Sequence, residues 1–159
     1  MENEIFGNML SRYDLITEQH KRNAIFEVNL QMILAGLYAG GLFESAAFYG
    51  GTCLRIFHGL QRFSEDMDFS LLTQDDKFDF TEYFPTIVDA FAMVGREVEI
   101  KKKDKKNFGK VESVDDVNKE EFELYCLNPL IHRRGIVKEQ CHNIDPEFKV
   151  KMPEVKMLY

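Results

Sequence analysis

The sequence has few of the features that mark secreted proteins, membrane proteins or structural zinc sites. It contains only three cysteines, Cys53, Cys126 and Cys141, which are far apart and include no C-x-x-C pair. This pattern excludes a disulfide framework and a zinc knuckle, and it favours a reducing compartment. No apolar run approaches the roughly 20 residues that a membrane-spanning helix needs. The first residues, MENEIF, carry acids where a signal peptide carries positive charge. We therefore expect a cytoplasmic protein.

The chain also lacks internal repeats, low-complexity tracts and Pro/Ser-rich linkers. With 159 residues, of which 45% are hydrophobic and 13% aromatic, it can bury a core of its own. We expect a single domain over residues 1–159. The formal net charge of −7 argues against a protein that coats nucleic acid or anionic membrane indiscriminately.

Positive charge is concentrated in one segment, residues 101–110, which holds six lysines and one aspartate. Its net charge of +5 could bind an RNA backbone, because phosphate contacts dominate such affinity. A solvated loop, or an arm that faces the acidic stretch at 115–123, explains the same residues. Both interpretations remain open at this point.

The hydrophobic pattern predicts an α/β fold with helices packed on a mixed sheet. A helical stripe begins at residue 23 and stops at Gly40 and Gly41, and a second stripe covers residues 81–94. A short apolar strand that we expect to be buried, residues 46–49, breaks at Gly50 and Gly51 and turns into a helix of about ten residues. Further strands are expected at residues 66–72, 96–103, 121–127 and 148–152.

The strand at 66–72 carries two aspartates that point to chemistry. Asp66 and Asp68 alternate with Met67 and Phe69, so both carboxylates should project from one face while the apolar residues enter the core. Carboxylates at i and i+2 lie roughly 7 Å apart along a strand and can converge on a hard cation. Mg²⁺ held by one or two carboxylates keeps its other positions for water and nucleotide phosphates.

The Gly-Gly-Thr turn at residues 50–52 supplies a second candidate feature. Glycines allow a phosphate to approach the backbone closely, and the N-terminus of the following helix favours anions. Thr52 adds a hydroxyl donor. Taken separately, a D-x-D strand is often a solvated face, and a Gly-Gly pair is often only a turn. Their order along the chain makes the combination more informative.

Together these residues resemble the AbiEii-type nucleotidyltransferase toxins, whose signature can be written F-x-G-G-T-x-L-R, a loop, then R-F-S-x-D-x-D-F. The matching residues are Phe48, Gly50, Gly51, Thr52, Leu54, Arg55, Arg62, Phe63, Ser64, Asp66, Asp68 and Phe69. The resemblance covers residues 24 to about 110 and is dense at 48–72. It implies a minimal polymerase-β-like nucleotidyltransferase fold, a nucleoside triphosphate donor with Mg²⁺, an RNA acceptor such as the 3′ end of tRNA, and a neutralising antitoxin protein.

The resemblance also implies roles for particular residues. Asp66 and Asp68 would hold the metal and, with Glu154, form the catalytic carboxylates. The nucleotide-binding residues would be Gly50, Gly51, Thr52, Arg55, Arg62 and Ser64. For Arg62, an ion pair with Glu65 explains the residue equally well.

The third carboxylate is the least regular part of the pattern. The fold expects it on a later strand, in a pattern that Lys149–Met152 fit, but Pro153 stands where the acid should be. Glu154 follows one residue later, and a one-residue slip turns a side chain to the opposite face of a strand. Glu97 and Glu99 could supply the acid instead if their strand neighbours the D-x-D strand; otherwise they form the wet side of an amphipathic strand.

The expected function is Mg²⁺-dependent transfer of a nucleoside monophosphate from a nucleoside triphosphate to an RNA, tRNA or other hydroxyl acceptor, in the toxin of a toxin–antitoxin pair. The alternative from another class is a nucleotide- or partner-binding protein that keeps the fold without turnover. A further alternative is that the chain is truncated at its C-terminus, and an incomplete domain could cover its exposed edges as a homodimer.

Overall fold

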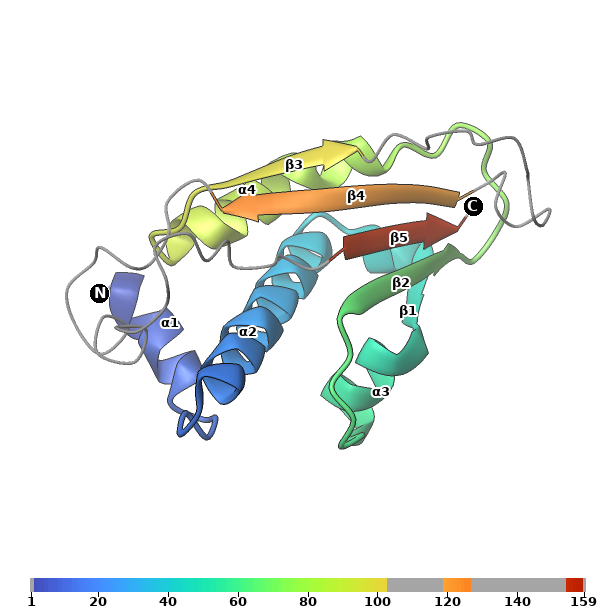
Figure 1. Ribbon diagram of the computed structural model, residues 1–159. Coiled ribbons are helices and arrows are strands. Elements are labelled where there is room, and N and C mark those ends of the chain that lie inside the picture. The colour runs from blue at the N-terminus through green and yellow to red at the C-terminus, as the bar shows by residue number, and fades with distance from the viewer. Residues whose placement is uncertain (1, 103–118, 127–153, 159) are drawn as a thin grey trace, which may run out of the picture.

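The chain forms a five-stranded mixed sheet with helices packed on it, in a computed structural model that describes residues 2–102, 119–126 and 154–158 (Figure 1). The strands stand in the order β1-β2-β5-β4-β3. β2 and β5 are parallel, whereas the other neighbouring pairs are antiparallel. The strands are β1 (Ala46–Tyr49), β2 (Asp66–Leu71), β3 (Val98–Lys102), β4 (Lys119–Cys126) and β5 (Glu154–Leu158). The predicted α/β class with a mixed sheet is confirmed.

The described helices are α1 (Glu2–Leu10), α2 (Glu18–Ala39), α3 (Gly50–His58) and α4 (Phe84–Met93), with short 3-10 helices η1 (Leu42–Glu44) and η2 (Phe80–Tyr83). α2 begins at Thr17, whose side-chain oxygen accepts a hydrogen bond from the backbone N–H of His20 at 3.1 Å. It ends where the chain reaches Gly40 and Gly41, and Gly41 adopts a left-handed φ of 82°. The predicted stop at these two glycines is confirmed.

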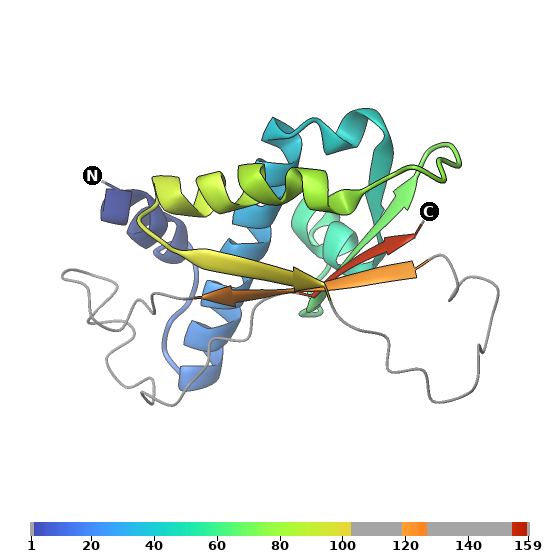
Figure 2. The ribbon, with the colours of Figure 1, turned by 90° about the horizontal axis from the view of Figure 1, so that it is seen from above.

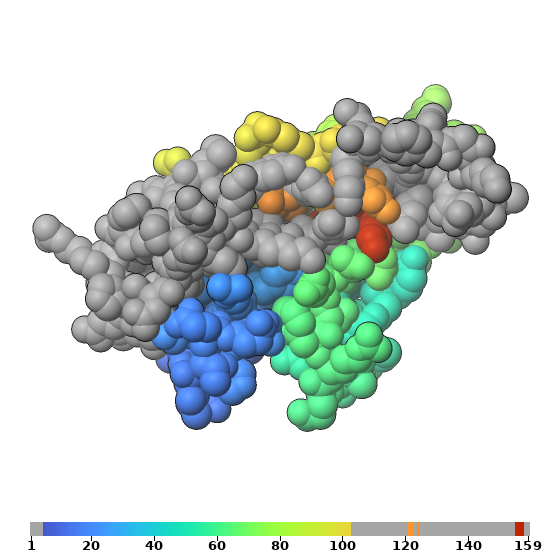
Figure 3. Space-filling view, viewed as in Figure 1, coloured from blue at the N-terminus to red at the C-terminus, as the bar shows by residue number. Residues whose placement is uncertain are grey.

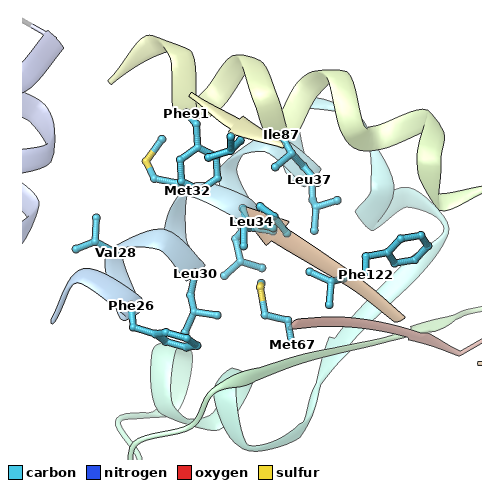
Figure 4. Packing of buried hydrophobic residues seen from close by; sticks show 14 of the residues in the cluster. Phe26, Val28, Leu30, Met32, Leu34, Leu37, Met67, Ile87, Phe91 and Phe122 are labelled. Atoms are coloured by element: carbon cyan, nitrogen blue, oxygen red, sulfur yellow. The ribbon is translucent and has the colours of Figure 1, made fainter. Parts of the chain in front are cut away.

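The core lies between the sheet and the helices α2 and α4. α4 runs along one side of the sheet, where α2 contacts it (Figure 2). The two helices touch so closely at Gly36 that a Cβ there would lie 2.5 Å from the Cα of Ile87. The buried side chains in Figure 4 fill this space; fully enclosed members of the cluster include Leu30, Ile33, Leu37, Met67, Phe69, Ile87, Phe91, Phe122, Val155 and Met157. Because this packing buries one face of β2, only the opposite face of this strand can contact a ligand.

Aromatic rings join η2 to the middle of the sheet. The rings of Phe80 and Phe122 stack with centroids 4.8 Å apart, and Phe84 meets Phe122 edge-on at 5.3 Å. Phe69 lies next to Phe80, at 6.5 Å between centroids. Such pairs add to the hydrophobic burial of each ring. They hold β2 and β4 against the helical layer.

One prediction about the strands is wrong, and two others fall wholly or largely outside the described residues. β1 is an edge strand and not a buried one, because only Ala46 of its four residues is buried. The expected last strand at 148–152 lies outside the described residues, and the structure instead has a strand at Glu154–Leu158, immediately after Pro153. Only Lys101 and Lys102 of the basic segment 101–110 are described, and both are exposed residues of β3.

The N-terminal helix α1 was not predicted. It packs on α2 and buries Phe6, whose ring centroid lies 4.6 Å from the guanidinium carbon of Arg96. Arg96 itself is buried and donates to the side-chain oxygen of Asn29. Whether the whole chain forms one domain, and whether it dimerises, stay predictions.

Candidate active site

The two aspartates of β2 lie on the face of the strand that points away from the core. Met67 and Phe69 are fully buried on the opposite face, whereas Asp66 and Asp68 are partly exposed. The side chain of Asp66 is 44% exposed. The predicted alternation along this strand is confirmed, because the apolar side chains enter the core and leave the carboxylates outside.

The glycine turn lies directly against one of these carboxylates. Tyr49, the last residue of β1, pairs with Asp68 across the two strands, and Gly50 follows with a left-handed φ of 83°. A Cβ at Gly50 would lie 2.8 Å from Oδ2 of Asp68, and a Cβ at Gly51 would lie 3.2 Å from Oγ of Ser64. The turn and the D-x-D strand therefore lie side by side, as the sequence pattern predicted.

α3 starts at this turn, so its N-terminus opens beside Asp68. The first N–H groups of a helix have no partner within the helix and favour a nearby anion. Glycine has no side chain of its own that could block a phosphate, and Gly51 is exposed while Gly50 is partly exposed. The arrangement is suited to a phosphate group held between the turn and a cation on the carboxylates.

The hydroxyl of Thr52 has its hydrogen-bonding partners inside the protein. Its side chain is buried, at 1% exposure, and its hydroxyl contacts Oγ of Ser64 at 2.8 Å and the backbone carbonyl oxygen of Asp66. The hydroxyl thus holds α3 and the end of the α3–β2 loop against the first residue of β2. This differs from the predicted contact with a phosphate, because the donor is already used inside the protein.

Arg55 is likewise engaged within the protein. Its Nε and Nη2 donate to the two carboxylate oxygens of Glu27 at 2.7 and 3.1 Å, and its Nη1 donates to the carbonyl oxygen of Gln61 at 2.9 Å. Glu27 is buried in α2, which explains why its charge needs a partner. Arg55 therefore fixes the loop that leads to β2, in place of the predicted phosphate contact. Arg62 is exposed in that loop.

The sequence analysis missed Lys156, which the structure brings into the site. β5 lies beside β2, so that Lys156 is in register with Asp68 on one side and with Glu121 of β4 on the other. Its Nζ donates to Oδ2 of Asp66 at 2.7 Å. This hydrogen bond, together with the charges of Asp66, Asp68 and Glu121, raises the pKa of Lys156, against the opposing effect of burial. The alternation of Val155, Lys156 and Met157 was the available signal.

Glu154 is the first residue of β5, and its backbone pairs with Asp66 in the parallel β2–β5 ladder, two residues before Lys156. Its predicted role as third carboxylate stays a prediction. Glu99, by contrast, lies on β3, which β4 and β5 separate from β2. Glu97 precedes β3. These two acids therefore cannot complete the site as proposed.

The donor set of the site fits a divalent cation that also binds a substrate. Two carboxylates on one strand face are sufficient for Mg²⁺ when phosphate oxygens and water complete its shell. Among residues 2–102, 119–126 and 154–158, no three His, Cys, Asp or Glu residues form a closed metal-binding cluster. Asp66 and Asp68 are the residues that would hold such a cation.

A family model described as "Nucleotidyl transferase AbiEii toxin, Type IV TA system" matches residues 32–126, which is more than half of the chain. The chain belongs to this family. The match includes the glycine turn and both aspartates. The comparison with curated proteins and the comparison with solved structures gave no significant match.

Membership of the AbiEii family supports two further statements. The family consists of nucleotidyltransferase toxins of type IV toxin–antitoxin systems, which implies a nucleotide substrate and an antitoxin partner. Nucleotidyltransferases of this kind usually use a divalent metal. Separately, the described helices include none that is both long enough and apolar enough to cross a bilayer.

Proposed function

We propose that this AbiEii-family protein transfers a nucleoside monophosphate from a nucleoside triphosphate to a hydroxyl group of an RNA acceptor, with Mg²⁺. The observation that carries the proposal is the contact between the glycine turn and the D-x-D strand, where a Cβ at Gly50 would lie 2.8 Å from Oδ2 of Asp68. This contact supports a site in which one triphosphate touches both the helix N-terminus and a metal on the carboxylates.

In this site, Asp66 and Asp68 would hold the metal, and the backbone N–H groups at Gly50 and Gly51 would bind phosphate oxygens. Bound there, Mg²⁺ would neutralise charge on the triphosphate and favour in-line attack. The acceptor's hydroxyl oxygen forms a bond to the α-phosphorus while the bond to the β-phosphate oxygen breaks. Pyrophosphate leaves, and the hydroxyl proton passes to water. Glu154 is proposed as a third carboxylate, and its backbone register with Asp66 supports this role.

Other residues of the signature act through position. Thr52 and Ser64 hold α3 against the start of β2, and the Arg55–Glu27 pair holds the loop between them. The spacing between the phosphate-binding turn and the metal-binding strand depends on these contacts. The RNA acceptor is supported by the family resemblance and by the basic segment 101–110, whose charge suits a phosphate backbone.

The test incubates the protein with Mg²⁺, each labelled nucleoside triphosphate in turn, and total tRNA. The wild-type chain should label an RNA, and Asp66→Asn combined with Asp68→Asn should abolish the label. The matched control is Asp75→Asn combined with Asp76→Asn, which removes the same charge from the exposed segment after β2 and should leave transfer unchanged. Equal labelling by the Asp66/Asp68 variant would overturn the proposal.

A second candidate function is nucleotide binding without turnover. The ion pair between Lys156 and Asp66 favours it, because a bound ammonium competes with a metal for that carboxylate. The same incubation distinguishes the two. A wild-type chain that binds a nucleoside triphosphate through Asp66 and Asp68, but labels no RNA with any of the four nucleotides, would support the binding protein and contradict the transferase.

A further inference from the structure

Lys156 is the unusual element of the proposed site, because it places a positive charge where the site gathers its negative charge. The side chain of Lys156 is 22% exposed, whereas the side chain of its partner Asp66 is 44% exposed. The strand that carries it lies between β2 and β4, so neighbours in register flank it on both sides. The ammonium group is therefore held in the site by the sheet and does not reach it from a flexible loop.

The position of the ammonium restricts where metal can bind. Nζ of Lys156 lies 2.7 Å from Oδ2 of Asp66, which is within the distance of a charge-assisted hydrogen bond. A divalent cation on the same oxygen would have to displace Lys156 or accept a positive charge next to it. Two-metal sites that clamp a phosphoryl group place their ions about 3.5–4 Å apart. A second ion at that spacing would use the carboxylate of Asp66, which Lys156 already contacts.

We propose that Lys156 is a resident cation of the nucleotide site, which takes the place of a second divalent cation next to Asp66 and donates to the phosphates of the bound triphosphate. The inference rests on the proposed function, since it concerns the same site. An ammonium group has three donors, and its hydrogen bond to Asp66 uses one. The site would then need one divalent cation, held by Asp68, by the other carboxylate oxygen of Asp66 and by the phosphates.

The first test counts and compares bound metal without any chemical turnover. Mn²⁺ is titrated into the full chain, and free Mn²⁺ is followed by electron paramagnetic resonance. The wild-type protein should bind one Mn²⁺, and Lys156→Met should bind Mn²⁺ at least tenfold more tightly, because the competing charge is gone. Lys156→Arg keeps the charge and should resemble the wild type. Lys21→Met removes a lysine that pairs with Glu18 in the first turn of α2, outside the basic segment 101–110, and it should also resemble the wild type.

The second test uses inorganic tripolyphosphate in the presence of a metal chelator, with binding measured by calorimetry. The wild-type chain and Lys21→Met should bind it, and Lys156→Met should bind at least tenfold more weakly. Two Mn²⁺ per wild-type chain, or equal Mn²⁺ and tripolyphosphate affinities for wild type and Lys156→Met, would overturn the inference. The number of Mn²⁺ ions bound by the wild-type chain tests the inference even if a variant fails to fold.

Neither measurement depends on nucleotide transfer. Absence of RNA labelling together with the expected Mn²⁺ and tripolyphosphate results would overturn the transferase and leave the role of Lys156 intact. Conversely, RNA labelling by a chain whose Mn²⁺ affinity does not change with Lys156→Met would overturn only the role of Lys156.

Discussion

Substituting Gly50 by alanine separates the structural role of the glycine turn from its role in the site. Gly50 has a left-handed φ of 83°, and its added Cβ would meet Oδ2 of Asp68 at 2.8 Å. Gly59, at the other end of α3, provides a matched control: its φ is 71°, and a Cβ there would meet nothing within 4 Å. Both alanines suffer the same backbone strain, but only one of them pushes against a proposed metal ligand.

The magnitudes follow from the two geometries. An L-residue in the left-handed region costs about 1–2 kcal/mol, so each variant should lose about that much unfolding free energy. In a chain of this size, the loss lowers the melting temperature by about 2–8 °C. To restore an ordinary contact of 3.4 Å, the carboxylate oxygen of Asp68 must also move by about 0.6 Å in Gly50→Ala. A displacement of this order at a reacting site lowers rates by about 10- to 100-fold.

The assay combines three measurements on both variants: urea unfolding, Mn²⁺ titration and labelled nucleotide transfer. Gly50→Ala and Gly59→Ala should be destabilised to a similar extent, because the far end of an aspartate side chain can rotate away at little cost in stability. Only Gly50→Ala should lose metal affinity and transfer. If Gly59→Ala lost both to the same degree, or if Gly50→Ala lost neither, the argument that the turn positions Asp68 would be refuted.

Three further predictions concern the contacts that support the site. Thr52→Val removes the buried hydroxyl and should cost about 1–3 kcal/mol in urea unfolding, because the carbonyl that it contacts stays buried; Thr52→Ser should retain most of that stability, and a fully stable valine variant would contradict the expectation. Glu27→Gln leaves the guanidinium of Arg55 without its carboxylate and should cost about 1.5–3 kcal/mol; a double-mutant cycle with Arg55→Met measures the coupling, and zero coupling would show that the pair contributes nothing. Hydrogen bonds from the hydroxyl and the backbone N–H of Thr81 lower the pKa of Asp79, so its stabilising effect should be present above the ordinary aspartate pKa of about 4 and be lost as the pH falls through the lower folded-state value. Asp79→Ala should therefore be destabilised at pH 7 and approach the wild type in acid, in unfolding curves recorded across that range; a difference independent of pH would contradict this assignment.

The sequence allowed the centre of the site to be predicted because its signals are local. Asp66 and Asp68 alternate with core residues within one strand, and the two glycines follow a short apolar segment directly. Both patterns depend on neighbours only a few residues away. The structure places the two aspartates on the predicted face and the turn beside Asp68.

The parts that could not be predicted depend on pairing between distant segments. Thr52 and Arg55 fit the family signature, but their partners Ser64, Asp66 and Glu27 are 12 to 28 residues away, and no local pattern reveals these hydrogen bonds. Lys156 was missed because the position of β5 is set by its pairing with β2 and β4. When the last strand is assigned to residues before Pro153, and not after it, a different set of residues is expected to face the site.

The central place of β5 has a consequence for the order in which the molecule is completed. β1 and β2 form one antiparallel pair, β3 and β4 form another, and β5 alone joins them. Asp66 and Lys156 are 90 residues apart in the chain, and a ribosome needs roughly 5–20 s to add that many residues. A growing polypeptide therefore carries its glycine turn and acidic pair for many seconds before the strand that joins the two strand pairs, and supplies the opposing charge, has been synthesised.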